Sequence, residues 1–115
     1  MSIMCTSENR TLIVKIIGEI EHCTSNEIKN KTDKEYKRLN SKNIIFDLSG
    51  VTFMDSSGIG VIMGRYKNVN ANGGIVAAAA INKELKKIFE ISGLFKIVKY
   101  YENIEKALNE FSLRG

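Results

Sequence analysis

The sequence of 115 residues has no proline or tryptophan, one histidine and only two cysteines. His22 has no partner at a metal-ligand spacing, so we expect neither a metal site nor a bound cofactor. Cys5 and Cys23 form neither a metal spacing nor a disulfide framework, and we expect both thiols to be reduced, with Cys5 packed in the first strand. We draw no functional conclusion from the lack of proline.

Long apolar runs and clustered charge are also missing. No stretch approaches the roughly 18 apolar residues of a membrane span, and residues 1–6 lack the basic and apolar regions of an export signal. The net charge of +4 is modest, and the Lys and Arg residues are spread along the chain. We therefore expect a cytoplasmic protein that neither spans a membrane nor binds nucleic acid, folded as one domain over residues 1–115.

Apolar patterns typical of strands and helices alternate along the chain. The expected strands cover residues 2–8, 11–17, 44–48, 75–80 and 95–100, with a hairpin turn at 9–10 and helices after the first hairpin and after each later strand. The order β-β-α-β-α-β-α-β-α predicts an α/β fold with a mostly parallel sheet, helices packed against it, and the first strand antiparallel at an edge.

Capping residues mark the expected helix starts. Thr24 and Glu27 form a capping-box pattern for the first helix, and Asn82 and Asn103 are suitable caps for the last two. In the second helix, the expected inner face consists of Ile59, Ile62, Met63 and Tyr66. Residues 49–54 are expected to connect the buried strand to this helix.

The start of the second helix carries the strongest chemical signal. Asp55, Ser56 and Ser57 place a carboxylate and two hydroxyls at a helix N-terminus, and any of the three could cap it. Backbone amide hydrogens and the helix dipole make such a position suitable for a phosphate group. A simple helix cap with no further role would leave the same pattern.

Three nucleotide or enzyme motifs do not fit this stretch. Gly58, Gly60 and Gly64 only loosely match a dinucleotide-binding turn, and the next strand does not end in the acidic residue that binds ribose. A phosphate-binding loop would need Gly-Lys-Ser/Thr, which is absent. A serine hydrolase would need Gly-x-Ser-x-Gly and a histidine with an orienting partner. We therefore expect no catalytic residues.

Residues 53–67, Phe-Met-Asp-Ser-Ser-Gly-Ile-Gly-Val-Ile-Met-Gly-Arg-Tyr-Lys, closely resemble the phosphorylation segment of anti-sigma factor antagonists, which belong to the STAS domain family. Residues 18–22 resemble the Gly-Glu-Leu-Asp-His loop of that family, and residues 91–97 resemble its late helix-to-strand junction. The similarity spans nearly the whole chain. The motif in residues 53–67 most resembles that of the antagonists that regulate the sporulation sigma factor, sigma F.

This resemblance implies a binding protein switched by phosphorylation, and not an enzyme. The unphosphorylated form would bind an ATP- or ADP-bound anti-sigma factor with serine kinase activity and so release the sigma factor for transcription. The kinase would then phosphorylate Ser56, and a serine phosphatase would reset the switch. A second possibility is a STAS subunit of another signalling or lipid-transport assembly.

The resemblance also indicates where the partner binds. The expected partner-binding residues are Glu21, Thr24, Asp55, Ser56, Ser57, Gly58, Ile59 and Gly60. Glu21 stands where the family usually has aspartate. We expect Gly58 and Gly60, which have no side chains, to keep the rim around Ser56 low, so that a partner backbone can approach Ser56 closely. Whether Ile59 lies at this rim or in the core, and whether Ser57 is a second phosphorylation site, stays open.

Overall fold

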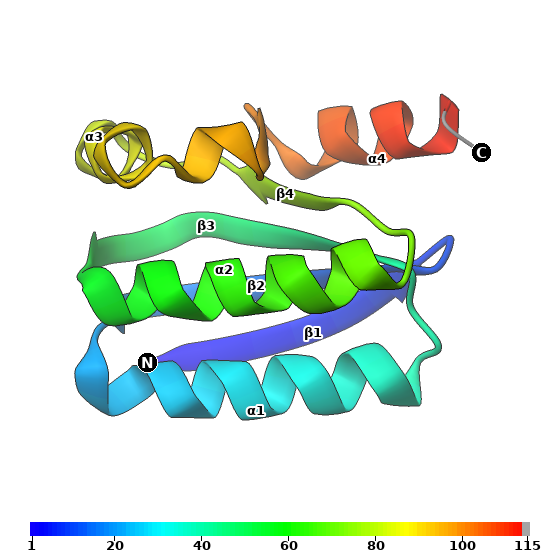
Figure 1. Ribbon diagram of the computed structural model, residues 1–115, viewed down its shortest axis with the longest axis horizontal. Coiled ribbons are helices and arrows are strands. Elements are labelled where there is room, and N and C mark those ends of the chain that lie inside the picture. The colour runs from blue at the N-terminus through cyan, green and yellow to red at the C-terminus, as the bar shows by residue number, and fades with distance from the viewer. Residues whose placement is uncertain (114–115) are drawn as a thin grey trace.

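The computed structural model describes residues 1–113, which form a five-stranded sheet with helices on both faces (Figure 1). In chain order the elements are β1 (Ser2–Glu8), β2 (Thr11–Ile20), α1 (His22–Arg38), β3 (Asn43–Met54), α2 (Ser56–Ala71), β4 (Val76–Ala79), α3 (Lys83–Ser92), a 3-10 helix (Leu94–Lys96), β5 (Lys99–Tyr101) and α4 (Ile104–Leu113). The strands lie in the order β1-β2-β3-β4-β5, with β1 antiparallel to β2 and the other pairs parallel. The expected fold class and the antiparallel edge strand are confirmed.

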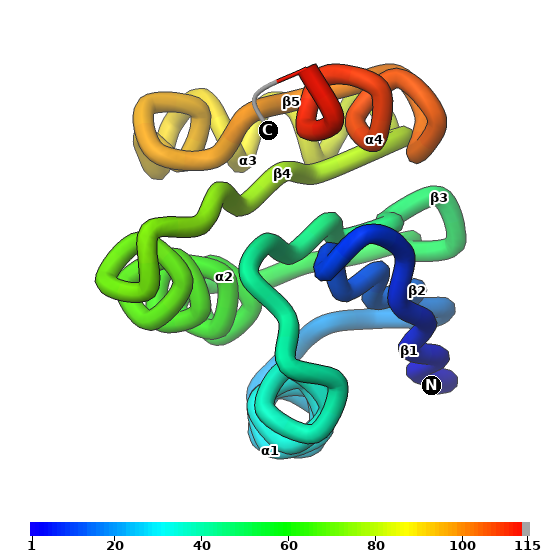
Figure 2. The backbone as a smooth tube through the Cα atoms, turned by 90° about the vertical axis from the view of Figure 1, so that its right-hand side faces the viewer, coloured from blue at the N-terminus to red at the C-terminus, as the bar shows by residue number. Residues whose placement is uncertain are grey.

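Two apolar clusters hold the layers together. The larger cluster joins one face of the sheet to α1, α2 and α3, and the smaller joins the other face to α4. Figure 2 shows α1 and α2 on one side of the sheet and α4 on the other. Because α4 covers only the half of its face near β3 and β4, the same face of β1 and β2 leaves Met4 and Ile17 exposed.

The central strands are buried on both faces, as their apolar runs predict. Phe46 of β3 packs in the larger cluster and Ile45 in the smaller, and neither side chain is exposed. Ala77 and Ala79 of β4 meet Ala107 of α4 in the smaller cluster. Their small side chains let the helix come close to the sheet.

The expected ends of the second and third strands and the expected start of the last strand are wrong. Residues 49–54 are not a connection but the second half of β3, because β2 itself continues to Ile20 and pairs with them as far as Ile20 opposite Met54. The last strand covers only Lys99–Tyr101, because residues 94–96 turn as a 3-10 helix after Gly93. There Val98 N–H donates to Leu94 C=O at 2.8 Å, and both side chains are buried.

The inner face of α2 also differs from the expected stripe. Its buried residues are Gly58, Ile62, Arg65 and Val69, whereas Met63 is 38% exposed. Ile62 is buried as expected, and Ile59 and Tyr66 are partly buried and pack against the larger cluster, so only Met63 is misplaced. Apolar periodicity does not find Gly58 and Arg65, because the first has no side chain and the second is a cation, whose Nε lies 2.8 Å from Asp33 Oδ1 on α1.

Candidate functional site

The helices α1 and α2 both begin at the carboxyl ends of neighbouring parallel strands. Ile20 at the end of β2 pairs with Met54 at the end of β3, and Asp55 N–H donates to Ile20 C=O at 3.1 Å. Each strand is followed directly by its helix, so the N-termini of α1 and α2 lie at the same end of the molecule (Figure 1). Parallel strands place both sets of first-turn amides at this edge.

Glu21 caps α1, which begins at His22 and not at the expected Thr24. Glu21 Oε1 accepts from Cys23 N–H at 3.1 Å, and Thr24 Oγ1 accepts from Glu21 N–H at 3.0 Å. The expected capping box of Thr24 with Glu27 is therefore wrong. Thr24 is instead the third helical residue of a box that Glu21 opens, a pattern that the sequence hides because glutamate is an uncommon cap.

Asp55 is the cap of α2, among the three candidates that the sequence offers. Its Oδ1 accepts from Ser57 N–H at 2.8 Å, and its backbone C=O accepts from Gly58 N–H at 3.1 Å. Ser56 is then the first helical residue and is exposed, whereas Ser57 is half-buried. The Ser56 hydroxyl makes no hydrogen bond to any residue within 1–113, so it is both accessible and dispensable for the cap.

Gly58 and Gly60 have different roles in α2. Gly58 is buried, and a Cβ placed on it would lie 2.5 Å from Met54 Cγ and 2.9 Å from Ile20 Cγ2. Gly60 is exposed, and a Cβ there would meet nothing within 4 Å. The expected low rim therefore applies to Gly60 alone, because Gly58 faces the strand ends and lets α2 pack closely on them.

The structure brings the remaining predicted residues to this end of the sheet. Ile59 is half-buried and packs against the larger apolar cluster, so it lies at the margin of the core. The sequence did not indicate Phe53, which lies near the end of β3, two residues before Asp55. Its side chain is 48% exposed. Strand alternation does not reveal this exposure, because Val51, two residues earlier, is buried and the register of β3 against β2 shifts between Val51 and Phe53.

The helix N-termini at this end of the sheet favour a bound or attached anion, whereas the nearby carboxylates repel an acidic partner surface. The N-termini of α1 and α2 carry partial positive charge from unpaired amides. Carboxylates of Glu19, Glu21 and Asp55 lie on the same segments. Chemically, the site presents an accessible hydroxyl where a phosphate can be tolerated, with acidic side chains around it.

No helix within residues 1–113 is both long and apolar enough to cross a membrane. Over the same described range, no group of three or more His, Cys, Asp or Glu side chains is placed to hold a metal ion.

Comparison with known proteins gives consistent matches over most of the chain. The family model of the STAS domain matches residues 2–107. An anti-sigma F factor antagonist of Paenibacillus polymyxa is 40% identical over 102 residues, which cover 89% of this chain and 87% of the relative.

Solved structures match the fold. The anti-sigma factor antagonist SpoIIAA in its unphosphorylated form superposes with a TM-score of 0.84 at 24% identity, covering 96% of each chain. The Bacillus cell fate determinant SpoIIAA in its phosphorylated form gives 0.75, also at 24% identity, over 96% of this chain and 99% of that one.

Proposed function

The chain belongs to the STAS domain family, and on that basis we propose that it is an anti-sigma factor antagonist controlled by phosphorylation of Ser56. Unphosphorylated, it binds an anti-sigma factor that has serine kinase activity and holds ATP or ADP, and the bound sigma factor is released. The kinase phosphorylates Ser56 and ends the complex, and a serine phosphatase restores the active form. These partners place its action in the cytoplasm.

The observation that carries this proposal is that Asp55, and not Ser56, caps α2. Asp55 caps α2 through its bond to Ser57 N–H, which leaves the exposed Ser56 hydroxyl without a structural task. A serine that capped the helix would lose its cap on modification. Here the helix start survives, and a kinase meets an accessible hydroxyl on a rigid element.

Phosphorylation would then act through charge with little refolding. A phosphate adds about −1.5 to −2 charges at neutral pH and three strong acceptor oxygens. The N-terminus of α2 stabilises such a charge by about 0.3 to 1 kcal/mol when it is exposed. The phosphate joins the carboxylates of Glu21 and Asp55, so the surface repels acidic groups on the partner, including the phosphates of its nucleotide.

The proposed partner surface surrounds Ser56 on α2 and the start of α1. Glu21 and Ser57 provide polar groups, and Gly60 leaves room for a partner backbone. Phe53 adds an exposed aromatic side chain near the end of β3, where it pairs with Glu19 of β2. Exposed aromatic residues flanked by polar ones are frequent anchors at protein interfaces.

The test is intact-mass analysis after incubation with ATP and the cognate anti-sigma kinase. We expect one phosphate on the wild type and on Ser57→Ala, and none on Ser56→Ala. Phosphate on Ser56→Ala but not on Ser57→Ala would move the site to Ser57. No phosphate on any form, with the kinase shown to be active, would refute the proposed switch.

Backbone amide spectra of both states test the local mechanism. We expect chemical-shift changes on phosphorylation to be confined to the starts of α1 and α2 and the adjoining strand ends. Large changes in β5 or α4 would show a refolding that the capping geometry does not explain. Ser56→Ala should bind the kinase and not be released by it.

A further inference from the structure

A pocket of about 620 Å³ lies at the opposite end of the sheet from Ser56. Its walls come from the β1–β2 turn, the starts of β2 and β3, the loop before β4, and the last turns of α4. The lining residues are Asn9, Arg10, Thr11, Lys42, Asn43, Gly73, Ile75, Leu108, Phe111 and Ser112. Pockets of about 300 to 1,000 Å³ accommodate small organic ligands.

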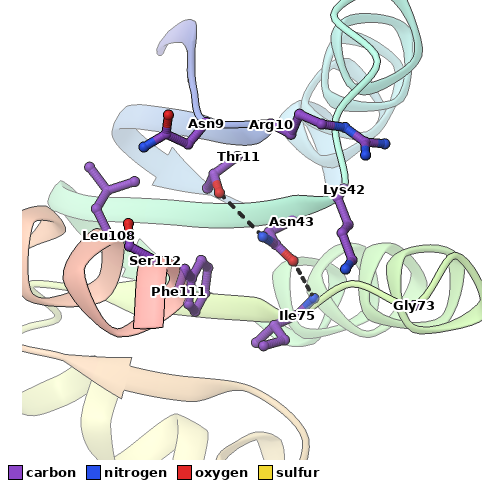
Figure 3. A pocket seen from close by; sticks show the side chains of 10 residues that line it. All are labelled: Asn9, Arg10, Thr11, Lys42, Asn43, Gly73, Ile75, Leu108, Phe111 and Ser112. Carbon is purple, nitrogen blue, oxygen red and sulfur yellow. Dashed lines mark hydrogen bonds between the residues drawn. The ribbon is translucent and has the colours of Figure 1, made fainter. Parts of the chain in front are cut away.

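The pocket has a cationic side and an apolar side. Figure 3 shows Lys42 and Arg10 on one side, and Leu108 and Phe111 on the other, with Ile75 between them. Arg10 Nε donates to Asn40 C=O at 3.1 Å, and Figure 3 shows the guanidinium directed away from Leu108 and Phe111. The Lys42 ammonium has no acceptor among residues 1–113.

The lining residues that the structure describes include two cations and no carboxylate, although the whole chain has 13 acidic residues. A neutral apolar ligand would leave both positive groups without a counter-charge. An anion with no apolar part would not use the surface of Ile75 and Leu108, both only half-buried. The lining therefore suits a molecule that carries both features.

Hydrogen bonds between neighbouring segments hold the polar walls of the pocket in place. Asn43, at its centre, donates to Thr11 Oγ1 at 3.3 Å and accepts from Ile75 N–H at 2.9 Å (Figure 3). Lys42 N–H donates to Arg10 C=O at 2.7 Å, and Lys42 C=O accepts from the Tyr36 hydroxyl at 2.6 Å.

The apolar wall is fixed in the same way. Phe111 is 7% exposed, and its ring makes an edge contact with Tyr101 at 6.2 Å between centroids. Binding to such preformed walls needs little ordering of the protein, which favours affinity.

We propose that this pocket binds a small amphipathic anion, that is, an organic molecule with one carboxylate, sulfonate or phosphate on an aromatic or short aliphatic group. The anionic group lies against the Lys42 ammonium, with Arg10 adding positive charge on the same side, and the apolar group lies against Ile75, Leu108 and Phe111. This site is independent of the proposed phosphorylation at Ser56.

The probe for the test is 8-anilinonaphthalene-1-sulfonate, titrated against the full chain and followed by fluorescence. Amide spectra of the same titration locate the site, and we expect shifts at residues 9–11, 42–43, 73–75 and 108–112. Lys42→Glu should weaken binding at least tenfold. Lys83→Glu, the same charge change at the exposed start of α3, should change the dissociation constant less than twofold.

A neutral analogue tests the role of the anionic group. N-phenyl-1-naphthylamine has the same rings without the sulfonate and should bind at least tenfold more weakly. Equal affinity of the two probes, or equal loss in both variants, would overturn the proposal. So would shifts centred on Met4 and Ile17, which would place the probe on the open face of β1 and β2. Thermal unfolding of each variant checks its fold, and Arg10→Gln should show a weaker loss in the same direction.

Discussion

Replacing Gly58 and Gly60 separately by alanine should change stability in opposite directions. The two glycines lie two positions apart in α2 and receive the same methyl group. At Gly58 the new Cβ would lie 2.5 Å from Met54 Cγ and 2.9 Å from Ile20 Cγ2, closer than real Cβ contacts allow. At Gly60 it would point into open space.

The magnitudes follow from helix propensity and packing. Alanine in place of an exposed helical glycine stabilises by about 0.5 to 1 kcal/mol, so Gly60→Ala should gain that amount. Gly58→Ala has a similar propensity gain, but forcing a methyl into a packed core costs about 1 to 3 kcal/mol. The Met54 side chain can shift, whereas Ile20 is β-branched and stiff. We expect a net loss of about 1 to 2 kcal/mol at Gly58.

Urea unfolding followed by circular dichroism measures both changes against the wild type. The two variants should differ by about 2 kcal/mol, or about 8 °C in melting temperature for a chain of this size. A Gly58→Ala protein as stable as Gly60→Ala would refute the close packing of α2 on the ends of β2 and β3. Kinase binding of the stable Gly60→Ala variant then tests whether a flat surface at that position matters to the partner.

Two further predictions concern the cap of α2 and the two thiols. Asp55→Ala removes the acceptor of Ser57 N–H and should cost about 1 kcal/mol of unfolding free energy, whereas Asp55→Asn should cost only a few tenths. Equal losses in urea unfolding would show that the carboxylate charge, and not the cap, is what matters. Burial raises the pKa of the Cys5 thiol, with the positive charge of Lys31 opposing it, so Cys5 forms less thiolate at a given pH. Iodoacetamide at pH 8 should therefore label exposed Cys23 before half-buried Cys5, as peptide mass mapping would reveal, and equal rates would contradict this burial.

Local sequence patterns correctly predicted the features that depend only on neighbouring residues. The short, β-branched apolar run of β3 predicts a strand buried on both faces, as observed, and Asn82 caps α3 by accepting from Leu85 N–H at 2.8 Å. Gly93 ends that helix with a φ of 79°, a conformation that glycine adopts without strain. Each of these features depends on residues within a few positions of one another.

The predictions were wrong where contacts with segments distant in the sequence determine the local structure. Residues 49–54 look like a loop alone, and they become strand because the end of β2 pairs with them. Glu21 becomes a cap because the same pairing ends at Ile20 and forces the chain into α1 there. The inner face of α2 includes Arg65 because Asp33 on α1 lies opposite, which no periodicity within α2 can indicate.

The α/β fold and the family resemblance of residues 53–67 could be predicted from the sequence, because strand runs, caps and short motifs are properties of neighbouring residues. Only the tertiary structure separated Asp55 as cap from Ser56 as the free hydroxyl, and Gly58 as a packing residue from Gly60 as an exposed one. It alone assembled the pocket around Lys42 and Phe111, since these residues are brought together by the order of strands in the sheet and not by their spacing in the chain.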